Sequence, residues 1–140
     1  MPQALKKKGG EGCLSHRKNI LIIEDDEDLA LTLSTILEGE GYRLFTAFNG
    51  EDGLRIANAI GPDLIILDLK MPKMHGAGVF AALRGPDGKP RIPTLIMTGY
   101  ADAAEIYPGF SVEGIYQKPM DLPVFMGHVR RILSPSRDAN

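Results

Sequence analysis

The chain has 140 residues, 44% hydrophobic and 24% charged, a size and balance that predict one globular domain with a single buried core. Its 16 basic and 18 acidic side chains leave a net charge of −2, which gives no electrostatic case for binding nucleic acid or an anionic membrane. No apolar run approaches the length that crosses a bilayer, and the single cysteine, Cys13, excludes an intramolecular disulfide.

The first segment, residues 1–17, has no apolar periodicity and carries the basic run Lys6–Lys8. A signal peptide would continue with an apolar stretch, but Gly9 and Gly10 follow the lysines instead. We therefore expect a disordered leader at 1–17, a flexible tail at 134–140, and a cytoplasmic location for the protein.

The first regular elements follow this leader. The run Asn19–Ile23 is apolar without alternation, as expected of a strand buried on both faces. Apolar residues then recur at helical spacing over 29–37, and Asp26 or Asp28 can cap the start of that helix.

The same alternation of strand and helix continues along the chain. We expect further strands at Tyr42–Ala47, Asp63–Leu67, Ile92–Met97 and Gly114–Gln117, and further helices near 54–60, 77–83, 102–107 and 122–133. The helix at 102–107 can only be short, because Pro108 and Gly109 follow it. This order predicts an α/β domain with a parallel sheet and right-handed crossovers.

Polar side chains stand where these strands end. They are Glu24, Asp25 and Asp26 after the first strand, Asp68 after the third, Thr98 after the fourth and Lys118 after the fifth. The carboxyl ends of parallel strands meet at one edge of a sheet, so we expect these groups to lie together. Carboxylates without His or Cys suit Mg²⁺, and a carboxylate can accept a phosphoryl group covalently.

Four motifs at these ends resemble the receiver domain of two-component response regulators. They are Ile20–Asp26, Asp63–Pro72 with Gly76, Pro93–Tyr100 and Tyr116–Pro119, and the resemblance covers about residues 18–133. It implies a flavodoxin-like (βα)5 fold, with a doubly wound parallel five-stranded sheet in the order 2-1-3-4-5. No DNA-binding sequence follows the last helix, so we expect a stand-alone, single-domain receiver.

The resemblance also implies a metal site and a phosphoacceptor. Asp68 would take a phosphoryl group from a histidine kinase or a histidine phosphotransfer protein. Mg²⁺ would be bound by Asp68, directly by Asp25, through water by Glu24, and by the backbone carbonyl of Lys70.

The remaining roles concern the response to phosphorylation. The Thr98 hydroxyl would move toward the phosphoryl group, and Lys118 would pair with it. The result would be a signalling switch that changes its binding to an unidentified downstream protein, without a nucleic-acid partner or membrane insertion. Such a protein assists its own phosphoryl transfer and dephosphorylation, but it is not a metabolic enzyme.

Two features depart from the family pattern. The short segment at 102–107 predicts a shortened or distorted fourth helix. Receivers usually carry an aromatic residue three positions before the lysine, but Ile115 stands there and the aromatic, Tyr116, comes one position later. We therefore expect the usual coupling between that aromatic and Thr98 to be absent or altered, and we expect only a structural role for His128 on the last helix.

Two other functions remain open at this stage. The altered switch region is compatible with a receiver-like binding module that has lost phosphorylation-dependent switching. A phosphatase of the haloacid dehalogenase type also uses an aspartate nucleophile, but it carries a second aspartate two positions later, where this chain has Lys70. That difference argues against the phosphatase.

Overall fold

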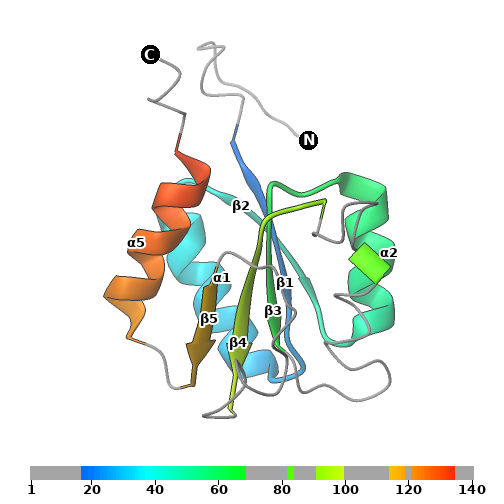
Figure 1. The fold of residues 1–140 in the computed structure, drawn as a ribbon, viewed down its shortest axis with the longest axis horizontal. Coiled ribbons are helices and arrows are strands. Elements are labelled where there is room, and N and C mark those ends of the chain that lie inside the picture. Colours follow the sequence, from blue (N-terminus) through cyan, green and yellow to red (C-terminus); the bar gives the residue numbers. More distant parts are fainter. Residues whose placement is uncertain (1–16, 69–81, 84–90, 100–113, 119–120, 135–140) are drawn as a thin grey trace.

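A five-stranded parallel sheet forms the centre of the molecule, a computed structural model that describes residues 17–68, 82–83, 91–99, 114–118 and 121–134 (Figure 1). The strands are β1 (Asn19–Ile23), β2 (Arg43–Ala47), β3 (Leu64–Asp68), β4 (Thr94–Thr98) and β5 (Gly114–Gln117). Their order is β2-β1-β3-β4-β5, so the prediction of a flavodoxin-like, doubly wound sheet is confirmed.

Strand burial follows position in the sheet. All residues of β3 and β4 are buried, which explains why their sequences are continuous runs without alternation. β2 and β5 lie at the two edges and are more exposed. The register aligns Ile23 with Leu67 and Asp68 with Met97, so the strands finish at nearly the same level.

Helices cover both faces of the sheet (Figure 1). α1 (Glu27–Gly39) and α5 (Leu122–Leu133) pack on one face in a core cluster with Ile22, and α2 (Gly50–Ile60) packs on the other in a cluster with Ile23. The alternation of side chains along β1 therefore supplies both cores.

Local signals in the sequence set the helix boundaries. Asp26 is the N-cap of α1, with its Oδ1 accepting from the backbone N–H of Leu29 at 3.1 Å, so the cap is Asp26 rather than Asp28. Gly61 ends α2 at a φ of 56°, a left-handed conformation that glycine adopts without strain. No helix in the described part of the chain is long and apolar enough to cross a membrane.

Three strand predictions were misplaced at their starts. β2 begins at Arg43 rather than Tyr42, whose backbone N–H donates to the carbonyl of Leu37 at 3.3 Å. β3 begins at Leu64 rather than Asp63, whose backbone N–H donates to the carbonyl of Asn19 at 2.8 Å and whose carboxylate accepts from the N–H of Asn19 at 2.8 Å. β4 begins at Thr94 rather than Ile92, and its last residue is Thr98.

Only Ala82 and Leu83 of the helix expected at 77–83 are described, and they are helical. The expected short helix at 102–107 lies outside the described residues, as do residues 1–16 and 135–140 of the expected leader and tail.

Candidate functional site

The charged and polar residues predicted at the strand ends do meet at the carboxyl edge of the sheet. Glu24 directly follows β1, and its backbone N–H donates to the carbonyl of Ala47 at 2.9 Å. Lys118 directly follows β5, and its N–H donates to the carbonyl of Thr98 at 2.7 Å. These two bonds prolong the parallel ladders, so backbone pairing itself carries both side chains to the site.

Burial distinguishes these groups from ordinary surface charges. Glu24 and Thr98 are fully buried, and Asp68 is 2% exposed. A buried carboxylate that lacks a compensating charge is strongly destabilising, so two of them in one place need a positive partner.

Lys118 supplies a positive charge to both carboxylates. Its Nζ lies 2.8 Å from Glu24 Oε1 and 3.3 Å from Asp68 Oδ2. Burial alone would lower the pKa of Lys118, but the nearby carboxylates of Glu24 and Asp68 outweigh it and raise that pKa above its ordinary value. The ammonium group therefore stays charged between the two acids.

The site makes ionisation of Glu24 unfavourable. Burial raises the pKa of Glu24 to about 7, and the negative charge of Asp68 adds to the rise. The contact with Lys118 and the backbone N–H of Asp26, which donates to Glu24 Oε2 at 3.0 Å, work in the opposite direction. A single lysine thus leaves the site short of positive charge.

The arrangement of oxygens suits a divalent cation. Glu24, Asp25 and Asp68 each offer a carboxylate oxygen, and these oxygens lie within 4.8 Å of one another, with Asp25 exposed and the other two buried. A set made only of oxygens is what Mg²⁺ prefers, and a cation there would relieve the cost of ionising Glu24. The Lys70 carbonyl, predicted as a further ligand, lies outside the described residues.

Asp26 is not part of this set. It caps α1, as described above, and its side chain is exposed. The adjacent acids Asp25 and Asp26 therefore differ in their surroundings: the carboxylate of Asp25 lies near those of Glu24 and Asp68, whereas that of Asp26 starts a helix.

Thr98 ends β4, between the strands that carry Asp68 and Lys118. It is two residues after Ile96 and therefore points toward the face of the sheet on which α2 packs. Tyr116 lies on the opposite face, against the cluster that contains α5. Tyr116, two residues before Lys118, therefore stands on the other side of the sheet from Thr98.

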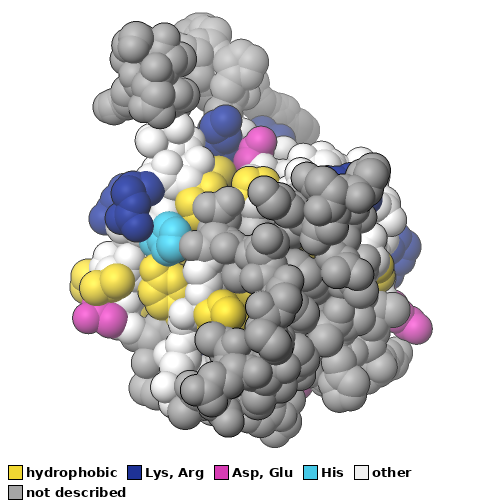
Figure 2. Space-filling view, viewed as in Figure 1, with side chains coloured by type: hydrophobic (Ala, Val, Ile, Leu, Met, Phe, Trp, Pro, Cys, Tyr) yellow, Lys and Arg dark blue, Asp and Glu magenta, His cyan; other side chains and the backbone are white. Residues whose placement is uncertain are grey.

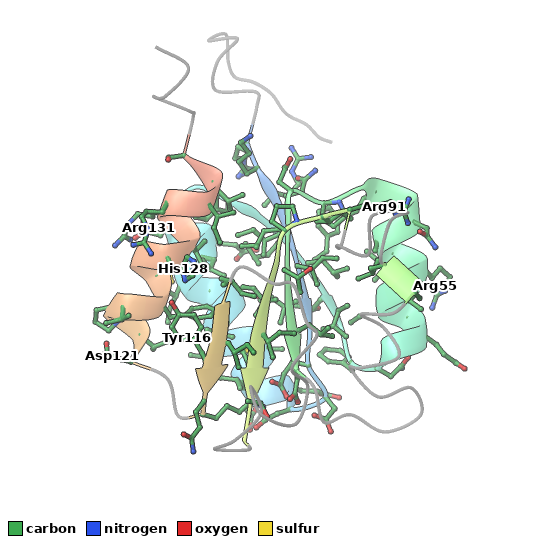
Figure 3. The ribbon with its side chains drawn as sticks, viewed as in Figure 1. Arg55, Arg91, Tyr116, Asp121, His128 and Arg131 are labelled. Carbon is green, nitrogen blue, oxygen red and sulfur yellow. The ribbon has the colours of Figure 1, made fainter. Side chains whose placement is uncertain are left out.

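One contact was not predicted from the sequence. The Tyr116 hydroxyl and His128 Nδ1 lie 2.6 Å apart and share a hydrogen bond between β5 and α5 (Figure 3). The available signal was Gly114, because a glycine inside a strand often marks the close approach of another group.

The chain matches the family model of the response regulator receiver domain over residues 20–130. The match therefore includes every side chain of the site that is described above.

Curated relatives match over most of this chain and about half of their own length. The DNA-binding response regulator MtrA of Mycolicibacterium smegmatis is 30% identical over 124 residues, which are 87% of this chain and 53% of the relative. The DNA-binding dual master transcriptional regulator RpaA of Synechocystis sp. is 34% identical over 116 residues, 81% of this chain and 48% of the relative.

Solved structures match over almost their whole length. The non-phosphorylated HemR receiver domain from Leptospira biflexa has a TM-score of 0.74 at 29% identity, covering 86% of this chain and 98% of that one. The signal receiver domain of a signal transduction histidine kinase from Syntrophus aciditrophicus has a TM-score of 0.73 at 34% identity, covering 84% and 90%.

Proposed function

Because this chain belongs to the response regulator receiver domain family, we propose that it is the phosphoacceptor switch of a two-component or phosphorelay system, with Asp68 as the acceptor. One observation carries the assignment of the residue. Asp68 ends the central strand β3, is buried, and lies 3.3 Å from the Lys118 ammonium and beside two further carboxylates. Receivers of this family are signalling switches rather than metabolic enzymes.

Glu24, Asp25 and Asp68 would hold Mg²⁺, with the Lys70 backbone carbonyl as a further ligand. When bound, the ion would neutralise the negative charge on the phosphoryl oxygens. Two observations support this proposal: the three carboxylate oxygens lie close together, and the pKa of Glu24 is raised.

In the transfer step, a carboxylate oxygen of Asp68 forms a bond to phosphorus as the phosphorus–nitrogen bond of a phosphohistidine donor breaks. The donor imidazole keeps the electron pair of that bond. Lys118 offsets the charge that arrives on Asp68, and the Thr98 hydroxyl donates a hydrogen bond to a phosphoryl oxygen. Hydrolysis of the acyl phosphate in the same site would return Asp68 to its free form.

The partners of such a switch are proteins. The donor would be a histidine kinase or a histidine phosphotransfer protein, and the cytoplasm is the location where we propose that they meet. The output would be a changed affinity for a downstream protein, and the net charge of −2 supports a protein rather than a nucleic acid as the partner of this chain.

Phosphate-affinity gels with acetyl phosphate and Mg²⁺ test this proposal. We expect a shifted band for the wild type, none for Asp68→Asn, and none for the wild type with excess chelator. Asp26→Asn is the matched control, because it makes the same chemical change in an exposed acid and keeps a good N-cap residue. An unshifted wild type, or a shifted Asp68→Asn, would refute the assignment.

A further inference from the structure

β5 leads directly into Lys118 but has little support from the described residues around it. It has four residues, lies at the edge, and pairs with β4 alone among the strands that the structure describes. Its residues are half-buried or exposed, unlike those of β3 and β4. An edge strand of this kind needs side-chain contacts to hold its rotation and register.

Tyr116 makes such contacts with α5. Its hydroxyl bonds to His128 Nδ1 at 2.6 Å, and its ring meets Phe125 edge to face, with ring centroids 5.0 Å apart and an interplanar angle of 83°. Figure 3 shows Tyr116 reaching from β5 toward His128 on α5. Figure 2 shows the histidine, in cyan, at the surface beside hydrophobic side chains.

Gly114 provides the space for the histidine. A Cβ atom at this position would lie 2.8 Å from His128 Cε1 and 3.3 Å from its Nδ1. The imidazole therefore packs directly on the backbone of β5, and α5 holds that strand at Gly114 and at Tyr116. Packing alone would hold the Tyr116 ring against α5, but the 2.6 Å hydrogen bond to His128 also fixes where its hydroxyl points.

We infer that Tyr116 and His128 are positioning residues for Lys118, and that their hydrogen bond couples the phosphoryl site to α5; this inference rests on the proposed function. Lys118 follows Tyr116 by two residues, and its Nζ must span the distance to the carboxylates of Glu24 and Asp68. A rotation or slip of β5 would move this ammonium away from both oxygens. Because energetic coupling is reciprocal, a phosphoryl group that draws Lys118 inward acts back on α5 through the same bond.

The test separates the hydrogen bond from simple packing. Tyr116→Phe keeps the ring against Phe125 and removes the hydroxyl. His128→Leu removes the ring nitrogen, whereas His128→Asn keeps a polar atom close to the position of Nδ1. Tyr42→Phe is the matched control, because Tyr42 packs against the same core cluster from the turn before β2.

The readout is the initial rate of Asp68 phosphorylation by acetyl phosphate at fixed Mg²⁺. We expect Tyr116→Phe and His128→Leu to lower this rate about three- to tenfold, because each variant loses one hydrogen bond. The double variant should be no slower than either single variant, since both remove the same bond. His128→Asn should stay within about twofold of the wild type, and Tyr42→Phe should be unchanged.

The outcomes distinguish this inference from the proposed function. A wild type that takes no phosphoryl group contradicts the proposed function. If the wild type is phosphorylated but Tyr116→Phe reacts as fast as Tyr42→Phe, the positioning role is overturned and the proposed function stands. Equal rates for His128→Asn and His128→Leu also overturn it, because a purely structural role would not depend on the polar atom. Should His128→Leu fail to fold in a urea titration, Tyr116→Phe and His128→Asn decide the question.

Discussion

β3 and β5 each deliver one charged residue to the same site, but they are held in very different ways. β3 is buried along all five residues and pairs with strands on both sides, so the core fixes the backbone of Asp68. β5 has four half-buried or exposed residues, pairs with β4 on one side within the described part of the chain, and is joined to α5 by the Tyr116–His128 hydrogen bond. In the proposed switch, the core would thus fix the acceptor Asp68, while its counter-charge Lys118 would follow a strand that could adjust.

The largest expected effect compares the two strands directly. Ile66→Ala, in the fully buried middle of β3, should lower the free energy of unfolding by about 2–5 kcal/mol. Ile115→Ala, in the half-buried β5, should cost only about 1 kcal/mol. Urea titrations measure both values, and equal costs would contradict the distinction between a rigid and an adjustable strand.

Removing the adjustable charge should slow the chemistry. Lys118→Gln leaves a side chain of similar length without a charge, and we expect the rate of phosphorylation by acetyl phosphate to fall about ten- to a hundredfold. Gln117→Ala is the control, because Gln117 is exposed and precedes the lysine. A Lys118→Gln rate within twofold of the wild type would show that this ammonium does not act on the phosphoryl group.

The raised pKa of Glu24 predicts a pH-dependent stability without Mg²⁺. Glu24 has a pKa of about 7 when folded and 4.5 as an ordinary carboxyl, so the folded protein holds the proton more tightly. The unfolding free energy should therefore fall as the pH rises from about 5 to 8, by about 1–3 kcal/mol. Thermal unfolding of the wild type and Glu24→Gln at each pH measures this contribution, which the variant should lack.

Mg²⁺ should reverse this trend. A cation binds the ionised carboxylates, so the stabilisation by saturating Mg²⁺ should grow over the same pH range. The same melting series with and without Mg²⁺ tests this expectation. A wild type whose pH dependence equals that of Glu24→Gln in both series would contradict the account of the site as short of positive charge.

The smallest effect concerns how α5 is attached. Arg130 on α5 pairs with Glu40 at 3.0 Å, but both side chains are exposed, so Arg130→Ala should change stability by less than about 1 kcal/mol. It should leave the phosphorylation rate unchanged. A slowing as large as that of Tyr116→Phe would mean that any contact of α5 matters, rather than the Tyr116–His128 bond.

The same contrast between β3 and β5 explains what could be predicted from the sequence. The buried strands are continuous apolar runs, and a parallel sheet places their last residues together, so the meeting of Asp68, Glu24 and Lys118 followed from strand order alone. The Tyr116–His128 bond depends on how α5 packs against β5. Gly114 indicates that some group comes close to β5, but not which side chain it is. The starts of β2, β3 and β4 were misplaced for a related reason, since the bonds around the first residue of a strand involve other elements, as those between Asp63 and Asn19 do.

The most direct test of the central claim identifies the residue that carries the phosphoryl group. Borohydride reduces an aspartyl phosphate to homoserine, which peptide mass spectrometry locates in the sequence. After treatment of the wild type with acetyl phosphate and Mg²⁺, we predict homoserine at position 68 and at no other aspartate. Homoserine at position 25 or 26, or a protein that contains none, would contradict the account.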